Sequence, residues 1–123
     1  MAKGANVYVL DDDNSVRKAL SRLLRIAGFN VLSFSNASSF LNDLKPNASG
    51  SLVTDLRMPG LLVEEIVKEM KCPESNINII VVSGDDDLVS KKIAKDIGAI
   101  GFFRKPVDGT ALIDSINWSL KKT

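Results

Sequence analysis

The feature that most constrains the fold is a strict alternation of two kinds of segment along the 123 residues. Short runs rich in β-branched and aromatic residues predict buried strands. Each run is followed by a segment in which apolar residues recur every three or four positions, which predicts an amphipathic helix. Five such units indicate a parallel sheet with helices on both faces, joined by right-handed crossovers. We therefore expect a single α/β domain over residues 1–123.

Turn and capping residues between the segments set the expected bounds of each element. The first helix should be capped by Asp13 or Asn14 and ended by Gly28 in a left-handed conformation. The strands are expected over residues 6–10, 30–34, 51–55, 77–83 and 99–103, and the later helices over 37–44, 63–71, 86–97 and 108–120. In the helix over 86–97, the periodicity predicts a buried face formed by Val89, Ile93 and Ile97.

Composition excludes several classes of function. The chain has 16 Lys and Arg against 15 Asp and Glu, so no excess charge indicates a nucleic-acid or membrane surface. A single cysteine, Cys72, allows no internal disulfide and indicates a reducing compartment such as the cytoplasm. The chain has no histidine, which excludes Ser-His-Asp and Cys-His nucleophiles, zinc sites built on imidazole, and phosphohistidine on this chain.

Polar residues end or follow four of the five expected strands at their carboxyl ends. Asp11, Asp12 and Asp13 follow the first, Asp55 is the last residue of the third, Ser83 is the last residue of the fourth, and Arg104 and Lys105, with Pro106 next to them, follow the fifth. Each alone is commonly a cap or turn residue, and Asp13 is expected to be one. Together they should meet at the edge of the sheet where such folds bind ligands.

The chemistry of this residue set favours a metal ion and a phosphoryl group. Clustered carboxylates repel one another, so at neutral pH the cluster needs a cation or must stay partly protonated. If a cation binds, an open site of oxygen ligands suits Mg²⁺. A carboxylate can itself accept a phosphoryl group and form an aspartyl phosphate. Lys105 supplies a positive charge for phosphate oxygens, and Ser83 supplies a hydroxyl donor.

The segments VYVLDDD, LVTDLRMPG, IIVVSG and GAIGFFRKP resemble the receiver domain of two-component response regulators over essentially the whole chain. They look most like receivers of the nitrogen-fixation and nodulation regulators, whose full-length members carry a C-terminal helix-turn-helix. The resemblance implies a flavodoxin-like sheet with strand order 2-1-3-4-5, which the periodicity does not determine. It also implies a cytoplasmic, phosphorylation-dependent signalling switch rather than an enzyme, with Mg²⁺ as its cofactor.

The resemblance assigns metal and phosphoryl roles residue by residue. Asp55 would be the phosphoacceptor and a Mg²⁺ ligand. Asp11 and Asp12 would be the acidic pair, with Asp12 a direct ligand and Asp11 acting through water. The backbone carbonyl of Arg57 would complete the protein ligands.

The resemblance also implies a switch and its partners. Lys105 would pair with the phosphoryl group, and its bond to Pro106 would be cis. Ser83 and Phe102 would couple the phosphate to the face formed by the fourth helix, the fifth strand and the fifth helix. The donor would be a sensor histidine kinase or a histidine phosphotransfer protein. Phosphorylation would promote a homodimer, and this domain would contact neither nucleic acid nor membrane.

One loop departs from the family pattern and keeps an alternative open. After LRMPG, the family usually has a Met, a small polar residue and a Gly, but this chain has Leu61, Leu62 and Val63. Because glycine allows a positive φ that a β-branched valine resists, we expect the loop over 59–64 to be rearranged, with Leu61 and Leu62 exposed. The departure leaves open a degenerate receiver that binds partners without phosphorylation. A phosphatase with an aspartyl nucleophile is disfavoured, because such enzymes usually need an aspartate where Arg57 stands.

Overall fold

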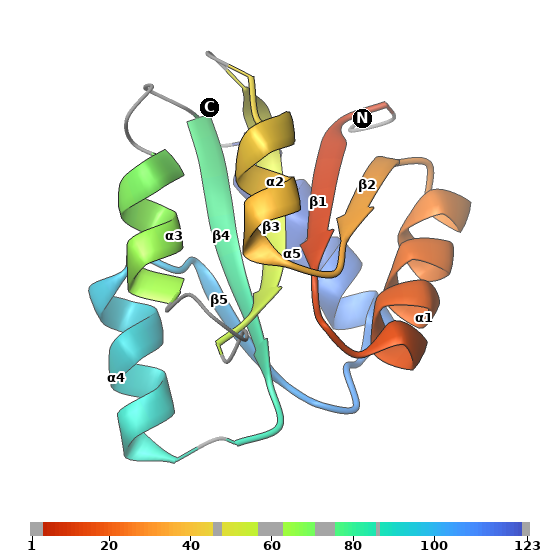
Figure 1. Cartoon of the computed structure of the whole chain (residues 1–123). Coiled ribbons are helices and arrows are strands. Elements are labelled where there is room, and N and C mark those ends of the chain that lie inside the picture. Colours follow the sequence, from red (N-terminus) through yellow and green to blue (C-terminus); the bar gives the residue numbers. More distant parts are fainter. Residues whose placement is uncertain (1–3, 46–47, 57–62, 71–75, 86, 122–123) are drawn as a thin grey trace.

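The computed structural model describes residues 4–45, 48–56, 63–70, 76–85 and 87–121 of the chain. Strands and helices alternate as expected (Figure 1). In order they are β1 (Asn6–Leu10), α1 (Asn14–Ile26), β2 (Asn30–Phe34), α2 (Ala37–Asp43), β3 (Ser49–Asp55), α3 (Val63–Met70), β4 (Asn76–Ser83), α4 (Leu88–Asp96), β5 (Gly101–Arg104) and α5 (Gly109–Lys121). Among the described residues, no helix is long and apolar enough to cross a membrane.

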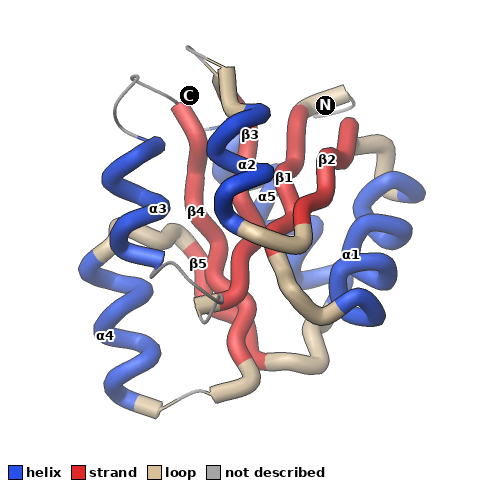
Figure 2. Tube along the Cα trace, in the orientation of Figure 1, coloured by secondary structure: helices blue, strands red, loops and turns tan. Residues whose placement is uncertain are grey.

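The strands form one five-stranded parallel sheet in the order β2-β1-β3-β4-β5. The fold class and the strand order implied by the resemblance are therefore both confirmed. Helices cover both faces of the sheet (Figure 2). Because every strand runs in the same direction, the carboxyl ends meet at one edge, toward the bottom of Figure 1. This edge is where the polar residues of the predicted site come together.

Two apolar cores lie on the two faces of the sheet. Successive residues of a strand point to opposite faces, so the buried strands contribute alternate side chains to each core. One core packs α2, α3 and α4 around side chains such as Phe40 and Ile66. The other packs α1 and α5 around Leu24 and Ile116. Full burial of one such side chain stabilises the fold by about 1.5–3 kcal/mol. The helices on both faces are therefore firmly packed on the sheet, and the sheet in turn fixes the positions of its carboxyl ends.

The bounds of two elements near this edge differ from the prediction. Helix α4 begins at Leu88 rather than at residue 86, because the side chain of Asp87 caps it by accepting a hydrogen bond from the Ser90 N–H. Strand β5 covers Gly101–Arg104 rather than 99–103. The predictions for α1 are confirmed, since Asp13 is its N-cap at the carboxyl edge of the sheet and Gly28 follows the helix at the opposite edge with a φ of 100°.

The predicted buried face of α4 is wrong at Val89. This side chain is 69% exposed, and its neighbour Leu88 is 85% exposed. The buried residues of the helix are Ser90 and Ala94. The other two predicted residues are in the core: Ile97, the C-cap residue, is 7% exposed, and Ile93 packs partly buried against the same cluster. Only Val89 was misplaced, because the small residues Ser90 and Ala94 take the buried positions in the first half of the helix while Leu88 and Val89 remain in solvent.

Candidate functional site

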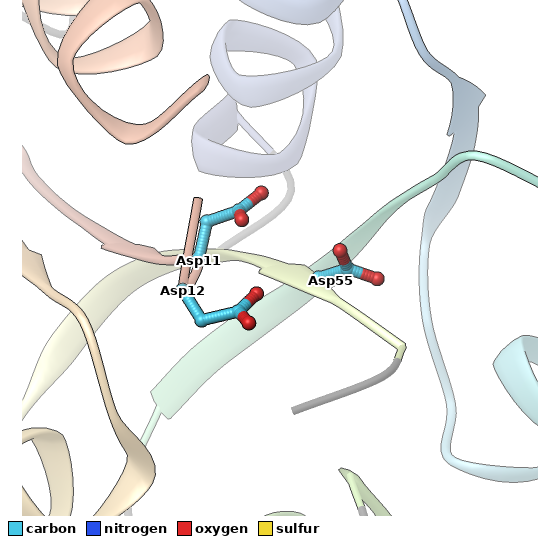
Figure 3. A group of neighbouring side chains, drawn as sticks. All are labelled: Asp11, Asp12 and Asp55. Atoms are coloured by element: carbon cyan, nitrogen blue, oxygen red, sulfur yellow. The ribbon is translucent and has the colours of Figure 1, made fainter. Parts of the chain in front are cut away.

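Three carboxylates converge at the carboxyl edge of the sheet (Figure 3). Asp11 and Asp12 follow β1, and Asp55 ends the neighbouring strand β3. One oxygen of each carboxylate lies within 4.8 Å of the other two. Asp11 is buried, Asp55 is partly buried and Asp12 is exposed. Three like charges at this separation repel, so the arrangement requires compensation by positive charge.

Lys105 brings one positive charge to the cluster from the loop after β5. Its Nζ donates hydrogen bonds to Asp11 Oδ2 at 2.9 Å and to Asp55 Oδ2 at 2.8 Å. Burial by itself lowers the pKa of Lys105, but the hydrogen bonds and charges of Asp55 and Asp11 outweigh it and raise that pKa. The ammonium therefore stays charged at neutral pH between the two carboxylates.

The backbone around Lys105 links the ends of β4 and β5. Its N–H donates to the carbonyl of Ser83 at 2.8 Å, and the peptide bond between Lys105 and Pro106 is cis. This connection places the lysine side chain over the end of β3, which pairs with β4. The sheet thus brings together the lysine and the aspartates, which lie far apart in the sequence.

The turn between β1 and α1 holds Asp11 through each of its polar groups. Its N–H donates to the Phe34 carbonyl at 3.2 Å, its Oδ1 accepts from the Asp13 N–H at 2.9 Å, and its carbonyl accepts from Arg17 Nη1 at 3.0 Å. Its Oδ2 accepts from Lys105. Asp11 is therefore a fixed part of the frame rather than a side chain free to move.

Ser83 and Phe102 lie on the adjoining strands β4 and β5. Ser83 is 2% exposed, and its Oγ accepts a hydrogen bond from the Asp85 N–H at 3.1 Å. It follows Val82, the residue that pairs in register with Asp55, so it stands beside the end of β3. Phe102 is partly buried and packs against the core under α2, α3 and α4.

Part of the predicted site lies outside the described residues. This holds for Arg57, the predicted carbonyl ligand, and for Leu61 and Leu62, which were predicted to be exposed. Val63, the last of the three departing residues, is described. It begins α3, and its side chain is 1% exposed within the core.

The sequence interpretation missed Arg17. Its helical phase groups it with Lys18 and Arg22 on the exposed face of α1, yet its guanidinium reaches back to the Asp11 carbonyl. Helical side chains lean toward the N-terminus of their helix, so a long basic residue one turn after the cap can reach the end of the preceding strand. That spacing from Asp13 is the signal that could have identified it.

The donor set of the cluster fits Mg²⁺. All of its ligands are carboxylate oxygens, and hard oxygen ligands with open positions suit this ion better than a closed calcium cage. Among the described residues, no group donates a hydrogen bond to the carboxylate of Asp12, which leaves both of its oxygens available. The cluster thus combines one open carboxylate with two that already pair with a lysine.

Comparison with known proteins identifies a family. Residues 7–117 match the response regulator receiver domain. The response regulator TodT of Pseudomonas putida is 41% identical over 115 residues, covering 94% of this chain and 51% of that protein. The regulator FixJ of Bradyrhizobium diazoefficiens is 38% identical over 118 residues, covering 94% of this chain and 58% of that protein. The likeness to nitrogen-fixation regulators is therefore confirmed.

The solved structures agree with the sequence comparison. Full-length FixJ from B. japonicum superposes with a TM-score of 0.87 at 35% identity, covering 98% of this chain and 59% of that one. The chain thus spans between half and three fifths of the length of these relatives. The matched region contains all of the sheet except Asn6, the first residue of β1, together with the aspartates and the lysine at its edge. By fold, by strand order and by sequence, this chain belongs to the response regulator receiver domain family.

Proposed function

We propose that Asp55 accepts a phosphoryl group and that this chain acts as a phosphorylation-dependent switch. The observation that supports it best is the environment of the Asp55 carboxylate. One oxygen accepts a hydrogen bond from the Lys105 ammonium at 2.8 Å, and an oxygen of each of the three aspartates lies within 4.8 Å of the others. A carboxylate so placed can act as a nucleophile next to the positive charge that a phosphoryl group needs.

The proposed transfer needs a donor on another protein. An Asp55 oxygen attacks the phosphorus of a phosphohistidine, a new O–P bond forms as the P–N bond breaks, and the electron pair leaves with the imidazole. Because this chain has no histidine, the donor belongs to a sensor histidine kinase or a histidine phosphotransfer protein. Lys105 remains charged and pairs with the phosphoryl oxygens. The domain phosphorylates its own side chain and is not an enzyme acting on a separate substrate.

The acidic residues would hold Mg²⁺ in different ways. Asp12, whose carboxylate is open, suits direct ligation together with Asp55. Asp11 suits contact through water, because Oδ1 already accepts from the Asp13 N–H and Oδ2 from Lys105. The backbone carbonyl of Arg57 completes the proposed ligand set. When bound, Mg²⁺ supplies positive charge that stabilises the transferring phosphoryl group.

The proposed output is a shift between two packings around Ser83 and Phe102. The Ser83 Oγ accepts from the Asp85 N–H, so its own hydrogen remains available to be donated to the phosphate. A turn of the Ser83 side chain toward the phosphate would vacate space into which Phe102 can move. This movement would alter the face formed by α4, β5 and α5, where a partner or a second copy binds. Contact with nucleic acid or with a membrane is not part of the proposal. A cytoplasmic location fits a chain with one cysteine.

Phosphorylation of the purified chain tests the proposal. Incubation with acetyl phosphate and Mg²⁺ should give an acid-stable, base-labile adduct on the wild type. Asp55→Asn should give none, whereas Asp43→Asn, which removes an exposed carboxylate from α2, should react like the wild type. Failure to form an adduct with acetyl phosphate and with a cognate kinase would contradict the proposal and favour a binding module that works without phosphorylation.

A further inference from the structure

Asp12 has a side chain to which no described residue donates a hydrogen bond, and a backbone that is held on both sides. The peptide group before it is fixed through the Asp11 carbonyl, which accepts from Arg17 Nη1 at 3.0 Å. The peptide group after it is fixed through the Asp13 N–H, which donates to Asp11 Oδ1 at 2.9 Å. The position of the Asp12 Cα is thereby set, and only the side-chain torsions remain to be ordered when a ligand binds.

Arg17 is itself held in the orientation that makes this contact. Its N–H donates to the Asp13 carbonyl at 2.9 Å as part of the first turn of α1. Its second guanidinium nitrogen, Nη2, donates to Asn14 Oδ1. A planar guanidinium can bond two acceptors in a fixed geometry, which a lysine ammonium cannot reproduce. The guanidinium therefore connects the start of α1 with the end of β1.

We propose that Arg17 is a positioning residue for the cation ligand Asp12. It acts through the backbone carbonyl of Asp11 and does not contact the cation. The inference rests on the proposed function, because it assumes that the acidic cluster binds Mg²⁺. It goes beyond the roles of the acidic residues themselves, since it assigns a function to a basic side chain on the neighbouring helix.

The hydrogen bond and the charge of Arg17 predict opposite effects on cation binding. A positive charge near the cluster repels Mg²⁺, so its removal through charge alone would tighten binding. Loss of the hydrogen bond frees the peptide group before Asp12 and raises the entropic cost of ordering that ligand, which weakens binding. The sign of the change therefore distinguishes a positioning residue from a residue that only contributes charge.

A Mg²⁺ titration of the full chain tests this inference. Binding would be followed by calorimetry and by the amide NMR signals of Asp12 and Asp13. Arg17→Met should bind Mg²⁺ about tenfold more weakly, the usual scale for groups that orient metal ligands. Arg22→Met is the matched control, because it removes the same charge from an exposed position of α1, and its affinity should change by less than about twofold. Arg17→Lys should restore part of the loss.

A second variant keeps the test independent of folding. Asn14→Ala leaves the charge of Arg17 in place and removes one acceptor of its guanidinium, so it should weaken Mg²⁺ binding in the same direction but less. Urea unfolding of each variant confirms that the chain is folded. If Arg17→Met and Asn14→Ala bind Mg²⁺ as tightly as the wild type or more tightly, the positioning role is wrong and the proposed function stands. A wild type that does not bind Mg²⁺ overturns both.

Discussion

The turn from β1 into α1 and the turn from β4 into α4 border the same acidic cluster, but the protein holds them in different ways. At the first turn, Asp11 has a partner for each polar group, and α1 buries Leu20 and Leu24 against the sheet. The second turn leads into a helix that buries Ser90 and Ala94 and leaves large apolar side chains exposed.

This difference suggests a division of labour around the site. A helix anchored along its length by large buried side chains cannot shift without losing apolar contacts. The buried residues within α4 are small, and its large core contacts, Ile93 and the capping residue Ile97, lie toward its C-terminal end, so its first turns lose less when they move. The β1–α1 side is therefore suited to hold ligands in a fixed geometry. The β4–α4 side is suited to change its packing when the site changes charge.

Truncation of a buried side chain of α1 should have the largest effect on stability. Leu24 is fully buried, so Leu24→Ala should lower the free energy of unfolding by about 3 kcal/mol. Urea denaturation measures the change. Ile26→Ala is the matched control, because Ile26 lies on the same helix and is 78% exposed, and it should change stability by less than about 0.5 kcal/mol. Equal losses in the two variants would show that α1 is not anchored through its buried face.

Removal of a helix cap should have an intermediate effect on stability, and the effect should differ between the two turns. Asp13 accepts two backbone N–H groups of α1, so Asp13→Ala should lower the free energy of unfolding by about 1 kcal/mol. Asp87→Ala should instead increase amide exchange within α4, with a smaller effect on global stability, because α4 can open locally. A larger global loss from Asp87→Ala than from Asp13→Ala would contradict the comparison.

The pH dependence of the free energy of unfolding should reveal the contribution of Lys105, which follows β5 and pairs with Asp11 after β1 and with Asp55 at the end of β3. The pKa of Lys105 is raised in the folded chain, against the opposing effect of burial, by Asp55 and Asp11. Its stabilisation is therefore fully present below the unfolded value of about 10.5 and is lost as the pH rises through the folded pKa. In Lys105→Met the free energy of unfolding should fall less steeply above that pH. Tyr8, whose pKa is also raised, first by burial and then by Asp43, contributes equally to both curves. If the free energy of unfolding depends on pH in the same way in the wild type and in Lys105→Met, Lys105 does not contribute to the pH dependence.

Substitution on the exposed face of α4 should have the smallest effect. Because Val89 is 69% exposed, Val89→Ser should leave the free energy of unfolding within about 0.5 kcal/mol of the wild type. Thermal or urea unfolding provides the measurement. A loss well above 1 kcal/mol would mean that this side chain is buried in solution and that α4 is as firmly anchored as α1.

Much of the fold followed from the sequence because its signals are local. Strands β1 and β2 begin and end where composition predicts, and the cap at Asp13 was predicted from its position before an amphipathic segment. The strand order could not be obtained from local signals, since periodicity shows that strands alternate with helices but not which strands are neighbours. That order came only from the resemblance to a family.

The site was less completely predictable than the fold. The aspartates and Lys105 could be placed at one edge because parallel strands share a carboxyl end. Arg17 could not be assigned from helical phase, because its target is a backbone carbonyl that only the turn after β1 presents. Val89 was misplaced because Ser90 and Ala94 take the buried positions of the helix, and such small residues carry little signal in a pattern of apolar positions. The predicted core contacts of Ile93 and Ile97 were right.

Amide hydrogen exchange with and without phosphorylation tests the division of labour most directly. The wild type would be measured in Mg²⁺ before and after treatment with acetyl phosphate, with Asp55→Asn as the control. We expect protection to change in α4 and β5, to stay constant in α1, and to change nowhere in Asp55→Asn. This division of labour would be contradicted if amide protection changed as much in α1 as in α4, or if Asp55→Asn showed the same change as the wild type. Either result would mean that the β1–α1 turn is not held fixed while α4 moves in response to phosphorylation.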